Sequence, residues 1–414
     1  MKRHFLSIVA SCVLLVAAAT SASAAGFALY EWSARGNALG GTLVGRADDP
    51  SAVAFNPAGI TQLEGTHIVV GGSVVAPLTE VVTSVGGVRE TTDSKDDLFL
   101  IPHFYVTHKI NDKWSVGFGE FSRFGLGFGY DEDWPGATNV YQATIKSFSL
   151  NPNVAYKVND RLSVALGVEY INVDLNIKKR LHSSVSADPA NPGYSKLEGD
   201  GSGVALTAGL HYKLDKWRFG AGYHSQAKVK AEGDTDISGS LGGALDGSHD
   251  TKGTVVLPDM ISFGVTYYPI ETLSVEVAAV NTRWSTYTDL DLDVDGLGTV
   301  EQPKDWHDVW RYSVGVEYDI NATWTVRGSY VYDEAPENAK YVDYMIPAGN
   351  RHLFSTGVGY KYQNWTVDVA YTYIKAEDVD YDRAAAENPA SGITPGDSKN
   401  GRTHIAALTI GYAF

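Results

Sequence analysis

The chain has 414 residues, with 49 Asp and Glu against 33 Lys and Arg, and a formal net charge of −16. Nucleic acid is excluded as a partner for so acidic a chain, because phosphate contacts require clustered lysines and arginines. A composition of 24 Tyr and 43 Gly with three Met and one Cys favours an exported β-protein over a soluble enzyme.

The first 24 residues have the parts of a secretory signal peptide. A basic start at Lys2, Arg3 and His4 leads into the apolar FLSIVASCVLLVAAA and the small residues SASA, which predicts cleavage after Ala24. The only cysteine, Cys12, leaves with this peptide, so the mature chain has no thiol for disulfides, metal binding or catalysis. The mature chain keeps 31 Lys and Arg against 49 Asp and Glu, a balance of −18.

Residues 25–65 follow, and they differ from the rest of the chain. RADDPSAVAFNPAGIT (46–61) has two prolines and neither alternation nor a helical stripe, yet it is too apolar for a solvated tail. The first predicted strand starts only at Thr66 and runs to Pro77. The role of residues 25–65 therefore depends on what the later strands enclose.

Six tight turns recur along residues 66–414. Each has a Tyr, a few residues, a turn that usually contains Asn or Asp, and then Trp or Leu opening a new alternating run: YVTHKINDKWSV (105–116), AYKVNDRLSV (155–164), HYKLDKWRF (211–219), YYPIETLSV (267–275), EYDINATWTV (317–326) and GYKYQNWTV (359–367). Longer acidic, Gly-rich stretches lie between them. Short turns at one end and long loops at the other predict an up-and-down antiparallel meander.

The predicted strands have two unlike faces. In 323–333, Trp324, Val326 and Tyr330 alternate with polar Thr325 and Arg327, and 365–374 repeats the pattern. Aromatic residues near both strand ends with aliphatic residues between them are typical of strands that face lipid. A soluble sandwich also has alternating strands, but it would not keep charged residues on its inner face.

The turns divide the chain into 14 strands, an even number that suits a closed barrel with both ends on the short-turn side. Closure removes the unpaired strand edges that lipid cannot tolerate. The last strand, THIAALTIGYAF, alternates down to Phe414 and resembles the C-terminal signal that the assembly machinery of bacterial outer-membrane barrels reads. We therefore predict an all-β transmembrane barrel over residues 66–414.

A barrel this wide holds either water or a plug. We expect residues 25–65 to form a small, mostly helical or irregular hatch inside the lumen, against inward groups such as Glu276, Arg327 and Asp368. The alternative is an N-terminal arm on the barrel rim. Asn56-Pro57-Ala58 is expected to form a rigid turn, because the Asn side chain bonds backbone groups that Pro cannot.

Several motifs in order resemble the FadL-type transporters of long-chain fatty acids in the Gram-negative outer membrane: AGFALYEWSARGNALGG, ADDPSAVAFNPAGIT, FGLGF with DWPG, NPNVAYKVNDRLSV, LPDMISFGVTYYP and IPAGNRH with GVGYKY. The resemblance spans the mature chain. It implies a hatch with the Asn-Pro-Ala motif, and a kinked third strand that opens the wall sideways for the ligand. No cofactor is implied, and a monomer is expected.

The resemblance also implies candidate site residues. Phe27 and Phe124 would line the inner ligand pocket, and Gly125, Gly127 and Gly129, at the end of a third strand from Trp114 to Gly125, would allow the kink. Arg123, where the family usually has Pro, and Lys146 would approach a ligand carboxylate, although a salt bridge is the alternative for each. Trp134 and Pro135 would line an outer groove.

Other functions are less well supported by the sequence. The ten His of the mature chain have no recognisable catalytic or metal-ligand spacing, which argues against an outer-membrane enzyme. DLDLDVDG (289–296) resembles a calcium loop, but Gln302 stands at the position of the bidentate Glu, so a strand extension is the better interpretation. A general porin, or uptake of aromatic or alkane hydrocarbons, remains an alternative to fatty acids.

Overall fold

The predicted signal peptide, with Cys12, lies outside the described residues. The computed structural model describes residues 26–347 and 349–414. Its strands are β1 Thr66–Val85, β2 Val88–Asp93, β3 Phe99–Lys109, β4 Trp114–Phe121, β5 Gly125–Gly129, β6 Gln142–Lys157, β7 Leu162–Arg180, β8 Tyr194–Leu214, β9 Trp217–His224, β10 Ala227–Ser238, β11 Gly247–Leu257, β12 Met260–Ile270, β13 Leu273–Thr282, β14 Leu292–Val294, β15 Gly298–Val300, β16 Val309–Asp319, β17 Trp324–Asp333, β18 Arg351–Tyr362, β19 Trp365–Ala376 and β20 Gly396–Ala413.

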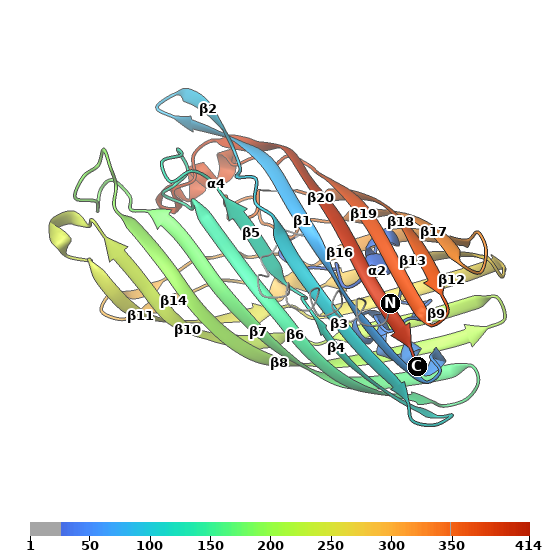
Figure 1. The fold of residues 1–414 in the computed structure, drawn as a ribbon. Coiled ribbons are helices and arrows are strands. Elements are labelled where there is room, and N and C mark those ends of the chain that lie inside the picture. The colour runs from blue at the N-terminus through green and yellow to red at the C-terminus, as the bar shows by residue number, and fades with distance from the viewer. Residues whose placement is uncertain (1–25, 348) are drawn as a thin grey trace, which may run out of the picture.

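The strands form one closed antiparallel barrel of 14 wall strands, as predicted. Closure comes from β1 and β20, which pair from His67 with Ala413 to Thr83 with Gly396. The pairs β4 and β5, β9 and β10, and β11 and β12 are each one wall strand with an interruption, while β2, β14 and β15 extend the wall at the long-loop end. Figure 1 shows the tilted strands running between the two ends. Among the described residues, no helix is long and apolar enough to cross a bilayer.

Two strand predictions needed adjustment. β1 begins at Thr66 as expected but continues past Pro77 to Val85, pairing with β2 beyond the reach of β3. Pro77 lies in the part of β1 between its pairing with β3, which ends at Val75, and its pairing with β2, which starts at Glu80. Because neither strand pairs with Pro77 on this edge, its missing N–H removes no hydrogen bond there. Residues Leu292–Val294 of the calcium-like stretch form β14, which pairs with β11 and β15, so this part is a strand extension.

The short turns are held by the residues that the sequence singled out. Asn111, Asn159 and Asn321 each accept two backbone N–H bonds within their own turn, at 2.8–3.0 Å. Asp215 and Gln363 adopt positive φ values of 48° and 53° in turns of only two residues. These side chains and conformations supply the reversal that a hairpin of this length requires.

The two faces of the wall follow the predicted alternation. Trp324, Val326 and Tyr330 are exposed on the outside, whereas Arg327 and Asp368 point inward and are largely covered. Cross-strand aromatic pairs lie beside the short turns, with ring centroids 4.5–4.7 Å apart: Trp114 with Tyr156, Trp217 with Tyr267, Trp324 with Tyr360 and Trp365 with Tyr412. This is the aromatic girdle of a membrane barrel at one interface.

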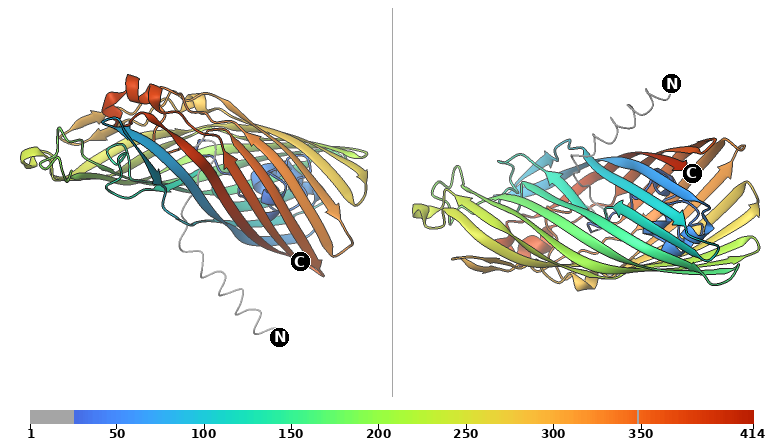
Figure 2. Two further views of the ribbon diagram at one scale, coloured as in Figure 1. Left: turned by 90° about the horizontal axis from the view of Figure 1, so that it is seen from above. Right: turned by 60° about the horizontal axis from the view of Figure 1, so that its bottom comes forward.

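The segment before β1 lies inside the bore (Figures 1 and 2). It contains α2 Ala34–Ala38, α3 Ala52–Phe55 and the 3-10 helix η1 Pro57–Gln62, and every residue from 26 to 63 is buried or half-buried. α2 packs on β18, β19 and β20, whereas η1 packs on β6, β7 and β8, so the segment spans the bore between opposite walls. The other helices, η2 Leu241–Gly243, η3 Trp284–Thr286, α4 Asp382–Glu387 and η4 Pro389–Ser391, lie in the long loops.

Candidate ligand pocket and wall interruption

The hydrogen-bonded wall is interrupted in its third strand. β4 pairs with β3 only from Ser115 to Glu120. Among the described strands β5 pairs only with β6, so residues 99–103 of β3 pair with β1 alone. The interruption falls at Ser122–Phe124, so Gly125, Gly127 and Gly129 lie just after it, within β5. A third strand running unbroken to Gly125 is therefore not observed.

Serine side chains explain why the break occurs before the glycines. Ser122 Oγ donates to the Ser147 carbonyl at 2.7 Å, and Ser147 Oγ donates to the Phe124 carbonyl at 2.5 Å. These bonds occupy backbone acceptors that the strand ladder would otherwise use, which diverts the chain from the wall.

The N-terminal segment fills the inner side of this interruption. Leu29 N donates to the Arg123 carbonyl at 2.7 Å, and Gly125 N donates to the Phe27 carbonyl at 2.8 Å, with Ala28 opposite Phe124 as a β-bridge. Residues 27–29 therefore act as a short extra strand at the break. On the same edge of β5, the one facing away from β6, Lys95 N donates to the Gly129 carbonyl at 2.8 Å.

Phe27 sits in an aromatic cluster beside the break. Its ring centroid lies 4.7 Å from Trp284, 5.4 Å from Tyr287 and 5.8 Å from both Trp306 and Phe124. Next to this cluster is a cavity, here called the aromatic pocket, lined by Phe27, Leu126, Ile145, Tyr287, Trp306 and side chains of the loop after β17. Its free volume is about 10 Å³, so a ligand must displace part of the lining.

The polar groups of the aromatic pocket come from two long loops. Lys304 Nζ lies 2.5 Å from Asp343 Oδ2, and both side chains are largely buried. Burial opposes the charge on Lys304, but the Asp343 carboxylate outweighs it and raises the pKa of the amine above its usual value. Glu337 also lines the pocket. A second cavity of about 290 Å³ shares Lys304, Tyr341, Val342 and Asp343 with it, and most of its other lining residues are polar, such as Asn139, Lys179 and Asn388.

Arg123 is fully buried, and the salt-bridge alternative describes it. Its Nη1 lies 3.0 Å from Glu169 Oε2, and Nη2 donates to the Pro258 carbonyl at 3.1 Å. His224 shares the same carboxylate oxygen at 2.9 Å and bonds the Ala54 carbonyl of the N-terminal segment through its other nitrogen. Arg123 therefore links the break to β7 and to Pro258 between β11 and β12. Through Glu169 and His224 it is also linked to α3.

Arg123→Ala should destabilise the barrel by about 3–5 kcal/mol, because it leaves the buried Glu169 without its main cationic partner. Unfolding in detergent, followed by the gel-mobility difference between folded and unfolded barrel, measures the change. Arg161→Ala, at an exposed short turn, is the matched control. Equal midpoints for the two variants would contradict this assignment.

The structure places Lys146 and Trp134 elsewhere than expected. Lys146 shares the outward face of β6 with the exposed Phe148 and lies opposite Asp174 of β7, so it is outside the inner pocket. Trp134 is buried, stacking on Tyr130 at 4.1 Å and meeting Tyr344 at 4.9 Å, so it belongs to the packed long-loop end and not to an open groove. Pro135 is half-buried beside it. For Lys146 the alternation of β6 was an available signal, whereas Trp134 lies in a long loop that has no alternation.

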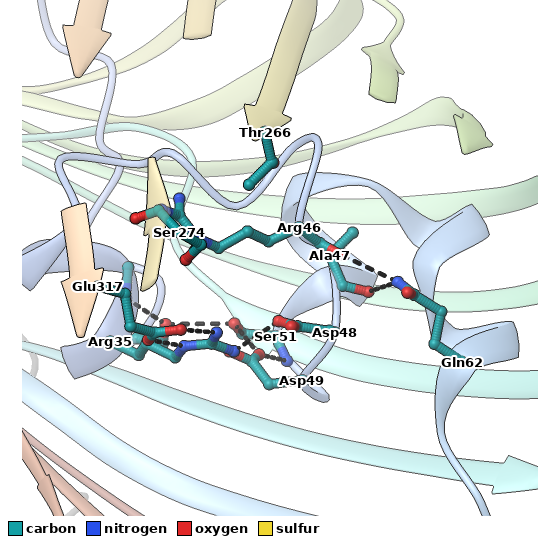
Figure 3. Close-up of polar contacts among 12 residues, drawn as sticks. Arg35, Arg46, Ala47, Asp48, Asp49, Ser51, Gln62, Thr266, Ser274 and Glu317 are labelled. Atoms are coloured by element: carbon teal, nitrogen blue, oxygen red, sulfur yellow. Dashed lines mark hydrogen bonds and ion pairs between the residues drawn. The ribbon is translucent and has the colours of Figure 1, made fainter. Parts of the chain in front are cut away.

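The N-terminal segment is attached to the wall by buried carboxylates. Glu276 accepts bonds from the consecutive Val44, Gly45 and Arg46 amides at 2.9–3.0 Å and lies 3.3 Å from Arg46 Nη1. Arg35 binds Glu317 with two nitrogens at 2.8 Å and also meets Asp48 and Asp49, as Figure 3 shows. The sequence prediction named Glu276, Arg327 and Asp368 as lumen groups but missed Glu317. An acidic residue at an inward position of a strand was the signal that could have identified it.

The Asn-Pro-Ala turn has the expected bonds. Asn56 Oδ1 accepts from the Ala58 amide at 3.3 Å, and Nδ2 donates to the Val44 carbonyl at 2.8 Å and to the Leu210 carbonyl of β8 at 3.0 Å. Pro57 begins η1, where its missing N–H is not needed. One side chain thus joins two parts of the N-terminal segment to the wall.

A family model and individual relatives place this chain in the same family. A family model described as outer membrane protein transport protein (OMPP1/FadL/TodX) matches residues 15–414. The 47 kDa outer membrane protein of Pasteurella multocida is 28% identical over 398 residues, covering 90% of this chain and 91% of the relative. The long-chain fatty acid transport protein of Escherichia coli K12 is 24% identical over 418 residues, covering 90% and 92%.

Solved structures share the fold. A FadL homologue of Pseudomonas aeruginosa has a TM-score of 0.83 at 20% identity, covering 94% of this chain and all of that chain. The toluene transporter TbuX of Ralstonia pickettii has a TM-score of 0.69 at 20% identity, covering 93% and 99%. At these identities the likeness shows the fold and does not choose between a fatty acid and an aromatic ligand.

Proposed function

Because this chain belongs to the OMPP1/FadL/TodX family of outer-membrane proteins that transport hydrophobic compounds, we propose that it takes up long-chain fatty acids passively and releases them sideways through the wall interruption at Ser122–Phe124. The single observation that carries the proposal is the aromatic pocket lying directly against that interruption. Phe27 takes part in both, through its ring in the pocket and its carbonyl at the break.

The physical reason for such a route is the cost of wetting an acyl chain. Burying each CH₂ gains about 0.8 kcal/mol, so a long chain avoids a water-filled pore. An apolar pocket that adjoins a break in the wall keeps the chain out of water between the long-loop end and the membrane interior. No energy source is required if a later step consumes the product.

In this proposal residues 25–65 are the hatch, and residues 66–414 are the barrel. The hatch closes the bore to water, while residues 27–29 close the wall interruption from inside. The polar cavity of Asn139, Lys179 and Asn388 at the long-loop end would receive the ligand first, with Tyr341 and Val342 separating it from the aromatic pocket.

A hydrocarbon is the second candidate ligand, and one observation favours it. Two cations along the route are matched by carboxylates: Arg123 by Glu169, and Lys304 by Asp343. Neither supplies an uncompensated charge for a fatty-acid carboxylate. The names of the relatives include both fatty acid and toluene transporters.

Uptake of labelled oleate by a strain that lacks its own transporter, with labelled toluene in parallel, tests the proposal. We expect oleate uptake to be restored when this protein is produced in the outer membrane. Toluene uptake without oleate uptake would transfer the proposal to hydrocarbons. A large, steady conductance of the unmodified protein in planar bilayers would favour a general porin instead.

A further inference from the structure

One carboxyl group in the aromatic pocket has no role in the ion pairs described above. Glu337 lies in the loop after β17, and its Oε1 is buried without a hydrogen-bond partner among the described residues. Buried polar atoms of folded proteins are almost always hydrogen-bonded, because an unsatisfied one has lost its bonds to water without replacement. The unsatisfied Glu337 oxygen lines the cavity, so it is available to bond a ligand there.

We propose that the Glu337 carboxyl is the head-group contact of the aromatic pocket and donates a hydrogen bond from its protonated form to a ligand oxygen, either of a fatty-acid carboxylate or of a long-chain alcohol. This inference rests on the proposed function for the apolar part of the ligand. In this proposal a neutral acid takes the place of the cation that would be expected in a carboxylate-binding pocket.

The charges around Glu337 favour the protonated form. Lys304 is the cation in the cavity lining, and its ammonium is already held by Asp343 at 2.5 Å. Arg351, at the start of β18, is already paired with Asp333. The titratable and charged groups around Glu337 are Lys304 from the loop before β16, Asp343 from its own loop, Arg351 from β18, and the phenols of Tyr287, Tyr341 and Tyr381.

Burial in this apolar environment raises the pKa of the Glu337 carboxyl to about 8, with Asp343 adding to the rise. The group is therefore a hydrogen-bond donor below about pH 8 and becomes an anion above it. A carboxylate ligand gains a charge-assisted bond from the neutral acid but is repelled by the ionised one. An alcohol differs, because its own O–H can donate to ionised Glu337.

The expected pH dependence follows from this difference. Oleate affinity should stay high up to about pH 8 and then fall towards tenfold per pH unit, since one proton must be taken up on binding. Oleyl alcohol affinity should change less than about threefold over the same range, because the bond survives with its direction reversed.

Binding to the purified barrel in detergent tests the inference apart from transport. Quenching of tryptophan fluorescence by dibrominated stearate and by dibrominated stearyl alcohol reports occupancy next to Trp306 and Trp284. Glu337→Gln keeps a neutral donor, so its affinity for stearate at pH 7 should be within about threefold of that of the unmodified protein. Its affinity should not show the decrease that the unmodified protein shows above pH 8. Glu337→Leu should bind both probes at least about tenfold more weakly at pH 7.

The exposed Glu387→Gln, also at the long-loop end, is the matched control and should leave both profiles unchanged. Any pH effect that persists in Glu337→Gln belongs to the ligand's own titration. If Glu337→Leu does not fold, as judged by its gel mobility, the Glu337→Gln profile decides. Stearate binding that falls equally in the unmodified protein and Glu337→Gln overturns the inference. Failed uptake with this binding profile intact would overturn only the proposed transport route.

Discussion

Replacing Glu276 by alanine is expected to release the N-terminal segment from the wall and convert the closed barrel into a steadily conducting pore. Glu276 is completely buried and binds three consecutive amides of the segment, with Thr266 Oγ1 donating a further bond at 2.6 Å. Its removal leaves those amides and the Arg46 guanidinium without their anion. Breaking one side of a buried charge pair costs about 3–5 kcal/mol, a large share of what holds a short segment in position.

Two measurements check this result. Conductance in planar bilayers should rise from closed or brief openings to a stable level, and trypsin should cut after Arg35 and Arg46, which are buried or half-buried in the unmodified protein. Glu271→Ala is the matched control, because Glu271 is exposed at the short turn of the same hairpin. A closed Glu276→Ala barrel with Arg46 still protected would show that the segment does not depend on this carboxylate.

The barrel itself could be predicted because its pattern is local. Each short turn carries its own signal, as Asn111 and Asn321 show, and each strand shows its two faces in sequence, as Trp324 and Arg327 do. Lipid on one side and a polar lumen on the other impose the same alternation on every strand. Strand number and closure follow from counting these signals, without knowledge of any long-range contact.

The site could be predicted only in part, because its residues meet through tertiary contacts. Phe27 and Phe124, both named as candidate pocket residues, have ring centroids 5.8 Å apart, but Lys304 and Glu337 come from long loops without periodicity. Arg123 faces Glu169 because of strand register, which a motif does not encode. The break precedes Gly125 because of serine bonds to β6, whereas the glycine pattern placed it later. Local conformational freedom permits a break, and contacts from elsewhere decide its position.

The wall interruption makes the second strong prediction, which concerns Ala28 and Phe124. A disulfide between cysteines at these positions should abolish oleate uptake, because residues 27–29 must leave the break before a ligand can pass through it. The two residues are opposite each other in an antiparallel bridge, flanked by the Leu29–Arg123 and Gly125–Phe27 bonds. Such a non-hydrogen-bonded pair brings Cα atoms to about 4.5 Å, within the range that a disulfide spans.

The mature chain offers a clean background, since Cys12 belongs to the predicted signal peptide. Uptake by the oxidised double variant should fall at least about tenfold and recover on reduction, whereas Ala28→Cys and Phe124→Cys alone should not respond to reductant. A disulfide between Ser355→Cys and Thr372→Cys, which are partners on β18 and β19, is the control for cross-linking as such. Undiminished uptake by the oxidised Ala28 and Phe124 double variant would mean that the ligand leaves by another path, through the bore past α2 and α3, and that the break is structural.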